Sequence, residues 1–157
     1  PLSKGAAFQF ALNDRYSVNG VRAFRPRSVG PGSFLADTSG ISTSLTDHTG
    51  NILMEYNLEL RHFFSKTWES ALFFDAGNVW TVKSSSELPG AEFRFGRFYR
   101  ELAAGAGAGL RYHFSFLVVR LDAALKLRDP SRPDGERWLK NGHRGSPVFS
   151  FSFGYPF

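Results

Sequence analysis

The chain has 157 residues, enough for one ordinary domain, and carries a formal net charge of +5. Its 19 Lys and Arg residues are scattered without a basic run, so the charge does not indicate a nucleic-acid partner. The absence of Cys excludes a disulfide framework and a thiolate metal site, and no apolar run approaches the roughly 20 residues of a membrane helix.

The first 50 residues are expected to be mostly irregular. Phe8 and Phe10 alternate with polar or small residues, which allows a short strand there. Residues 21–32 are too rich in Gly and Pro for the interior of a strand or helix, and residues 33–50 are mainly Ser, Thr, Asp and Gly. The sequence therefore predicts one long loop over residues 1–50.

Arg22 is the residue of this loop that we single out. Its neighbours are apolar, and Pro26 and Pro31 restrict the chain that follows. An arginine fork meets a carboxylate with two parallel hydrogen bonds, so a guanidinium on a restrained loop indicates a carboxylate partner. The alternative is an ordinary solvated arginine on a surface loop.

Five long segments after residue 50 alternate between apolar and polar residues with the period of two that is typical of strands. Most are about ten to thirteen residues long, which is near the span of a tilted membrane strand. Short turns alternate between them with long polar loops at about 82–100 and 129–147, as in an outer-membrane barrel. The segments are residues 52–61, 69–81, 101–114, 116–128 and 149–157.

The two faces of these segments differ in character. One face is aromatic and aliphatic, whereas the other carries Glu59, Asp75 and several glycines. In a membrane barrel the apolar face contacts lipid, because only a closed sheet or a helix pairs every backbone group in hydrocarbon. In a soluble β-sandwich the same face would be the core, and alternation by itself leaves this open. Five strands are too few to close a barrel, so other strands must come from upstream sequence or partner chains.

Three motifs resemble the BamA/TamA superfamily of outer-membrane barrel insertases, also called the bacterial surface antigen family. Residues 21–24 (Val-Arg-Ala-Phe) followed by Gly30 and Pro31 are similar to its loop motif, with Ala23 where the family has Gly. Residues 73–77 match its Phe-x-Asp-x-Gly motif, and residues 57–60 resemble the preceding strand with its inward glutamate. The resemblance covers essentially the whole chain.

This resemblance implies an all-β fold in which about five antiparallel strands form the C-terminal part of a transmembrane β-barrel of about sixteen strands. Residues 1–50 would be the sixth external loop, folded into the lumen, and residues 51–157 the last barrel strands. The implied location is the outer membrane of a Gram-negative-type cell. The implied role is non-enzymatic protein insertion or translocation, through a seam where the first and last strands pair weakly.

The resemblance also implies particular site residues. We expect Arg22 to dock on Asp75 and Glu59 inside the barrel, and the alternative is independent solvation of these charges in a polar lumen. Gly105, Gly107 and Gly109 would remove side chains where the loop approaches the wall, so that Gly107→Leu displaces the loop. Further docking residues are Val21, Phe24, Phe73 and Gly77. The last strand resembles a C-terminal assembly signal and would form the seam edge, with Phe149, Phe151, Phe153, Tyr155 and Phe157.

No pattern indicates an enzyme, a metal site or a cofactor. The histidines His48, His62, His113 and His143 lack metal-ligand spacing, and there is no nucleophile elbow. The expected partners are outer-membrane lipid, nascent outer-membrane barrel proteins, the upstream part of the same barrel, periplasmic repeats and assembly lipoproteins. The competing functions are a passive transport or structural barrel, such as a porin or adhesin, and a soluble β-sandwich binding module.

Overall fold

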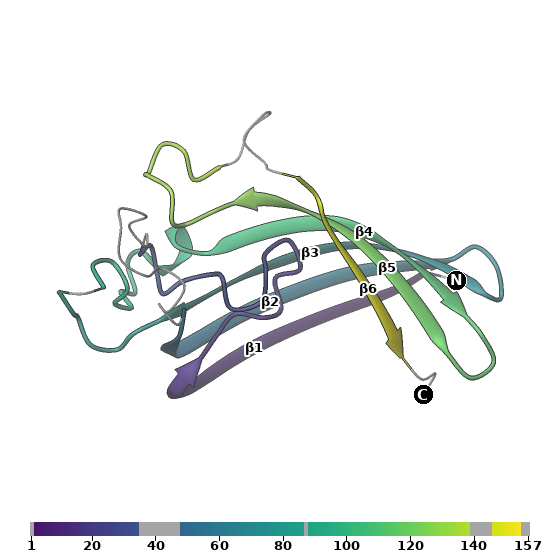
Figure 1. Cartoon of the computed structure of the whole chain (residues 1–157), viewed down its shortest axis with the longest axis horizontal. Helices are drawn as coiled ribbons and strands as arrows, with labels where there is room; N and C mark the ends of the chain where they lie inside the picture. The colour runs from purple at the N-terminus through teal and green to yellow at the C-terminus, as the bar shows by residue number, and fades with distance from the viewer. Residues whose placement is uncertain (1, 35–47, 87, 139–145, 155–157) are drawn as a thin grey trace.

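A computed structural model describes residues 2–34, 48–86, 88–138 and 146–154, with only the backbone of residues 2–16 apart from Gly5. The described residues form one antiparallel sheet of six strands in the order β1-β2-β3-β4-β5-β6 (Figure 1). No helix in the described ranges is long and apolar enough to cross a membrane. The elements are β1 Leu2–Tyr16, β2 Gly50–Phe63, β3 Trp68–Trp80, the 3-10 helix η2 Phe98–Arg100, β4 Ala103–His113, β5 Val118–Arg128 and β6 Val148–Gly154.

The prediction of a loop over residues 1–50 is wrong for its first third, because Leu2–Tyr16 forms the full-length strand β1. This strand pairs along β2, with Phe8 opposite Tyr56 and Phe10 opposite Met54. Small residues in its first half, such as Gly5, leave little alternation between apolar and polar residues in the sequence. The neighbouring strand supplies a backbone ladder that local propensity does not predict. The other five strands correspond to the five predicted segments.

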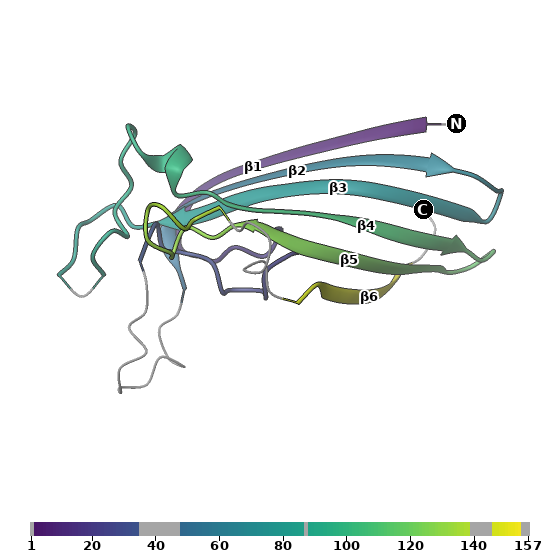
Figure 2. The same cartoon turned by 90° about the horizontal axis from the view of Figure 1, so that it is seen from above.

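The sheet is curved, and the loop that follows β1 lies on its concave side, as Figure 2 shows. Tight turns join β2 to β3 and β4 to β5 at one end, and the longer connections gather at the other end (Figure 1). This arrangement brings the arginine loop over the inward-facing positions of β2 to β5. We call the end with the long connections the loop end and the opposite end the turn end.

The buried apolar residues lie between the loop and the concave face of the sheet. Phe24 and Val29 of the loop belong to one buried cluster with Phe73 of β3 and Val79 near its end. On the convex face, large apolar side chains are uncovered: Leu72 is 62% exposed and Leu58 is 58% exposed. A soluble β-sandwich would bury this face under a second sheet, so the observed single sheet fits a lipid-facing wall instead.

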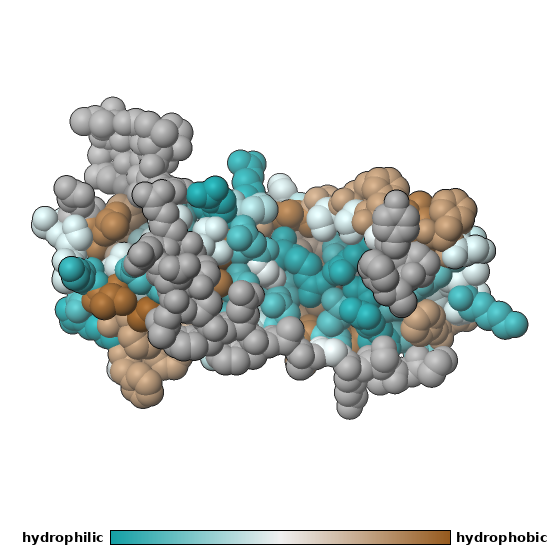
Figure 3. Space-filling view, turned by 90° about the horizontal axis from the view of Figure 1, so that it is seen from below, coloured by the Kyte–Doolittle hydropathy of each residue, from teal (hydrophilic) through white to brown (hydrophobic). Residues whose placement is uncertain are grey.

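Exposed aromatic residues gather toward both ends of the long axis. Figure 3 shows hydrophilic groups in the middle of one side of the molecule and hydrophobic groups toward its two ends. Aromatic girdles at two interfaces are typical of membrane-spanning strands. The exposed residues are Phe64, Trp68, Phe114 and Phe116 beside the turns, and Phe95, Tyr99 and Trp138 beside the long connections.

Candidate functional site

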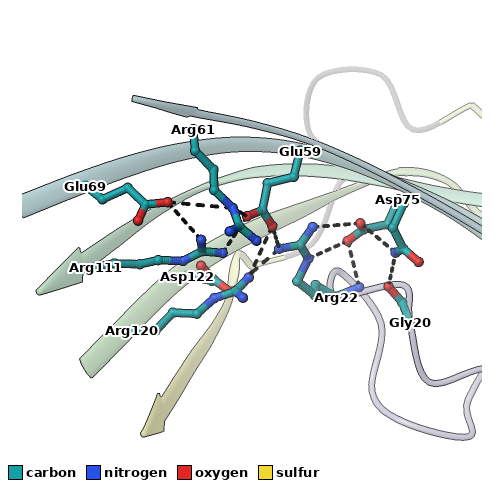
Figure 4. Close-up of polar contacts among 10 residues, drawn as sticks. Gly20, Arg22, Glu59, Arg61, Glu69, Asp75, Arg111, Arg120 and Asp122 are labelled. Carbon is teal, nitrogen blue, oxygen red and sulfur yellow. Dashed lines mark hydrogen bonds and ion pairs between the residues drawn. The ribbon is translucent and has the colours of Figure 1, made fainter. Parts of the chain in front are cut away.

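The loop after β1 is a compact turn that directs Arg22 toward the sheet. The Phe24 N–H donates to the Val21 carbonyl at 3.0 Å, and the Arg27 N–H donates to the Val18 carbonyl at 3.0 Å, which closes the loop on itself. The apolar residues Val21, Ala23 and Phe24 are buried against the strands. The buried apolar neighbours fix the turn, and the Arg22 side chain points toward Asp75 and Glu59 (Figure 4).

Arg22 binds Asp75 of β3 through a two-pronged contact. Its Nε and Nη2 atoms donate to the two carboxylate oxygens at 2.8 Å each, and its backbone N–H donates to Oδ2 at 3.2 Å. The Arg22 Cζ atom lies 3.5 Å from the centre of the Phe73 ring, and Asp75 is fully buried. This is the planar, bidentate geometry that a lysine does not reproduce.

The third nitrogen of Arg22 extends the contact to β2. Its Nη1 atom donates to Glu59 Oε2 at 2.9 Å. Burial disfavours the charged guanidinium, but the hydrogen bonds to Asp75 and Glu59 outweigh it and raise the pKa of Arg22 above its ordinary value. Arg22 therefore stays a cation, and its docking depends on the carboxylates that receive it. We call the contacts of Arg22 with Asp75 and Glu59 the inner anchor.

Glu59 also belongs to a larger network of charges on the concave face (Figure 4). Glu59 Oε1 accepts hydrogen bonds from Arg111 Nη2 at 2.5 Å and from Arg61 Nε at 2.6 Å, and Arg120 Nη2 lies 3.6 Å from Glu59 Oε2. Asp122 pairs with Arg120 at 2.6 Å. The network thus sets four guanidinium groups against four carboxylates and spans β2 to β5. Its members are Arg22, Arg61, Arg111, Arg120, Glu59, Glu69, Asp75 and Asp122.

The backbone of the loop is held by two further side chains of β2. Glu55 Oε1 accepts the N–H groups of Asn19 and Gly20 at 2.8 Å each. The Asn57 side-chain amide donates to the Gly20 carbonyl at 2.7 Å and to Asp75 Oδ1 at 2.9 Å. Alternate residues of one strand face therefore hold the loop, as the period of two requires.

The three glycines of β4 create space for three different groups. A Cβ atom at Gly105 would lie 2.4 Å from the Ala23 Cβ, so this glycine receives the loop itself. At Gly107 a Cβ would lie 2.5 Å from the Phe73 ring, and at Gly109 it would lie 2.1 Å from Asp122 Oδ1. The expectation that all three face the loop is wrong for Gly107 and Gly109, because strand register places wall residues opposite them.

A second contact holds the loop at the loop end of the sheet. The Gly32 N–H donates to the Val79 carbonyl at 2.7 Å, and the Asn78 side-chain amide donates to the Gly32 carbonyl at 2.8 Å. The Ser33 N–H donates to the Gly90 carbonyl at 3.1 Å. Asn78 also donates to the carbonyl of Glu101. We call the contacts of Gly32 and Ser33 with these groups the outer anchor.

The structure brings the predicted docking residues together around the loop. Gly77 lies beside the loop, since a Cβ built there would be 3.2 Å from Val21 Cγ2, and the Phe24 ring lies 4.4 Å from Lys126 Nζ. Of the residues predicted for the seam, Phe149, Phe151 and Phe153 are exposed, and Tyr155 and Phe157 lie outside the described residues. Further residues of the site that were not predicted from the sequence are Glu55, Asn57, Asn78, Glu101, Arg111, Arg120 and Asp122.

The missed residues had only a weak signal in the sequence. Arg111, Arg120 and Asp122 fall on the polar strand faces, where charges are often solvated. Only the pairing of the strands, such as Gly109 opposite Asp122 and Arg111 opposite Arg120, shows that they meet. In the part of the chain that the structure describes, no group of three or more His, Cys, Asp or Glu residues is arranged to hold a metal ion.

The sheet with an uncovered apolar face and a charged concave face defines a segment of an outer-membrane β-barrel wall. A family model described as the Omp85 superfamily domain matches residues 5–157. The chain belongs to the Omp85 superfamily, which agrees with the resemblance to BamA/TamA-type barrels. No significant match was found among curated proteins or among solved structures. Membership of this superfamily supports a role in outer-membrane assembly or translocation, and a location in the outer membrane.

Proposed function

We propose that this chain is the C-terminal part of an outer-membrane protein assembly factor, an insertase or translocation barrel that acts through a lateral seam at β6. The observation that carries the proposal is the inner anchor, in which Arg22 of an inserted loop is bound by Asp75 and Glu59 of the wall. A passive porin or adhesin has no need of a charged latch between a loop and the strands of its wall.

The charge network supports this reading because it reaches β5, the neighbour of β6. Arg120 and Asp122 pair in register with Ser152 and Ser150 of β6. A short chain of ion pairs on the concave face therefore runs from the loop to β5, and the backbone ladder of β5 holds β6. In this proposal, docking of the loop changes the free energy with which β6 pairs to β5. The loop and the last strand are then coupled.

The last strand has the features that a seam requires. It is the final strand of the sheet, and its shared ladder with β5 runs only from Val118 to Ala124. An available strand edge templates the pairing of another strand. The proposed partners are therefore nascent outer-membrane barrel proteins, the first strand of the same barrel, periplasmic repeats and assembly lipoproteins.

A cross-linking experiment on the full-length protein tests this function. Ser150→Cys and Ser152→Cys would be placed in β6, with the matched control Ser70→Cys in the wall strand β3, and a client barrel protein would carry single cysteines along its first or last strand. We expect disulfide cross-links from positions 150 and 152 to the client or to the protein's own first strand, and none from position 70. A protein that supports assembly without any β6 cross-link would contradict the proposal. A steady ion conductance without client contact would favour the passive barrel.

A further inference from the structure

Three arginines meet at the loop end of the sheet, outside the inner anchor. The Arg128 guanidinium donates to the carbonyls of Leu102 and Arg100. Arg137 Nη1 donates to the same Arg100 carbonyl at 3.2 Å. Two guanidinium groups therefore converge on one carbonyl oxygen, and the residue that carries this oxygen is itself an arginine. We call Arg100, Arg128 and Arg137 the rim cluster.

The rim cluster has fewer carboxylates than the network on the concave face. Among the described residues, neither Arg100 nor Arg128 makes an ion pair with a carboxylate, although Arg128 is only 8% exposed. Arg137 pairs with Asp134 at 2.7 Å, and that aspartate side chain is 90% exposed. The concave network sets four cations against four anions, whereas the three arginines here have only the solvated Asp134 and the buried Glu101, which already pairs with Arg97 at 2.8 Å. A buried guanidinium without an anion is costly, so the rim cluster is suited to an anion from outside the chain.

The surroundings of the rim cluster indicate what carries that anion. The Arg100 Cζ atom lies 5.6 Å from the Tyr99 ring centre, and the Arg128 Cζ atom lies 5.6 Å from the Trp138 ring centre. Both rings are more than half exposed, and Phe95 nearby in the sequence is 82% exposed. Aromatic side chains of this kind occupy the boundary between acyl chains and headgroups.

The position in the fold agrees with this boundary. Figure 2 shows η2, which contains Tyr99 and Arg100, on the convex side of the sheet at the loop end, whereas the arginine loop lies on the concave side. The convex side carries the exposed leucines of the lipid-facing wall. Long loops of outer-membrane barrels lie on the external side, so the rim cluster lies at the level of the outer-leaflet headgroups.

We propose that the rim cluster binds a phosphate group on the headgroup of an outer-leaflet lipid, with Tyr99 and Trp138 against the lipid at the boundary of its headgroup. Arginine forks match phosphate oxygens with paired hydrogen bonds, which favours a phosphate over a single-point anion. This inference is independent of the seam at β6, because it concerns the outer rim and requires no client protein.

The test uses the full-length protein in a neutral detergent with a bis-phosphorylated lipid A as the probe. We expect this lipid to bind at equilibrium. Removal of its phosphates should raise the dissociation constant about tenfold or more, because charge-assisted hydrogen bonds are lost. Equal binding of the dephosphorylated lipid would overturn the proposal. Full displacement of the lipid by inorganic phosphate at millimolar concentration would identify a site for free phosphate and would also overturn it.

Matched variants separate a site from general surface charge. Arg100→Gln and Arg137→Gln should each weaken lipid binding about tenfold. Arg94→Gln removes the same charge from the same rim, but Arg94 is 61% exposed and already pairs with Glu92 at 3.1 Å, so it should leave binding unchanged. If Arg94→Gln weakens binding as much as the other two, or if neither Arg100→Gln nor Arg137→Gln weakens it in folded protein, the rim cluster is not a phosphate site.

Discussion

The two anchors of the arginine loop hold the same segment by different physical means. The inner anchor joins charged side chains, with Arg22 between Asp75 and Glu59. The outer anchor uses mainly backbone groups, with Gly32 bound to the Val79 carbonyl of β3, Ser33 bound to the Gly90 carbonyl of the connection between β3 and β4, and Asn78 as its chief side chain. One anchor depends on the complementarity of buried charges, and the other depends on the close approach of two backbones.

This difference explains which residues each anchor needs. The inner anchor requires a fixed strand register, because a slip by one residue would move Asp75 to the lipid face. The outer anchor requires a residue without a side chain at position 32, where φ is +58° and a Cβ would lie 2.2 Å from the Gly90 carbonyl oxygen. We therefore expect a single substitution in the charged inner anchor to release the loop there, and a single lost hydrogen bond in the outer anchor to weaken docking only slightly.

The largest effect is expected from Arg22→Ala. This change leaves Asp75 buried and without its cation, which costs about 3–5 kcal/mol of docking free energy. The loop should leave the wall, and a cysteine introduced by Val21→Cys should become reactive to a maleimide, because Val21 is only 2% exposed in the docked loop. The chain has no native Cys, so the labelling rate reports position 21 alone within it.

Two companion variants sharpen this prediction. Arg22→Ala combined with Asp75→Asn removes the uncompensated buried charge and should recover part of the lost docking. Arg61→Ala serves as the control, because the Arg61 side chain is 44% exposed and its pair with Glu59 is worth about 1 kcal/mol or less. Equal labelling in Arg22→Ala and Arg61→Ala would mean that the inner anchor does not hold the loop.

A smaller effect is expected where Ala23 meets β4. Gly105→Ala would place two methyl groups 2.4 Å apart, and overpacking of this kind costs about 1–3 kcal/mol. The double change Ala23→Gly with Gly105→Ala moves the methyl group from the loop to the wall and should restore docking, as measured by labelling at Val21→Cys. If the double variant does not restore docking, steric overlap between positions 23 and 105 is not the cause of the effect of Gly105→Ala.

The smallest effect is expected from Asn78→Leu at the outer anchor. Of the hydrogen bonds that this change removes, only the one to the Gly32 carbonyl holds the loop, so the docking free energy falls by about 1 kcal/mol. The bonds of Asn78 with the Glu101 carbonyl and the Val79 N–H are also lost, and that loss lowers the stability of the wall. A cysteine from Val29→Cys should label faster, whereas one from Val21→Cys should label at the unchanged rate, because the inner anchor still holds. Equal acceleration at both positions would show that the two anchors act as one unit.

Much of the wall was predictable from the sequence. The period of two separated the lipid face of each strand from the face that carries Glu59 and Asp75, and the motifs at residues 21–24 and 73–77 indicated which loop residue meets them. Within Leu2–Tyr16 only a short strand around Phe8 and Phe10 was predictable, because the small residues carry little alternation and the order of the full strand comes from the ladder with β2. The outer anchor was also not predictable, since the glycine at position 32 marks a special backbone conformation but does not indicate which backbone groups it binds.

The sequence by itself determined that this is an all-β chain with one apolar and one polar face per strand, and it predicted a carboxylate partner for Arg22 against the alternative of a solvated arginine. Only the tertiary structure decided that Glu59 is shared with Arg111, that Gly105 receives Ala23, and that Arg100, Arg128 and Arg137 converge at the rim. The physical reason is that alternation is a local property of each strand. Pairing of charges between strands instead depends on register and curvature, which exist only when the whole sheet has formed.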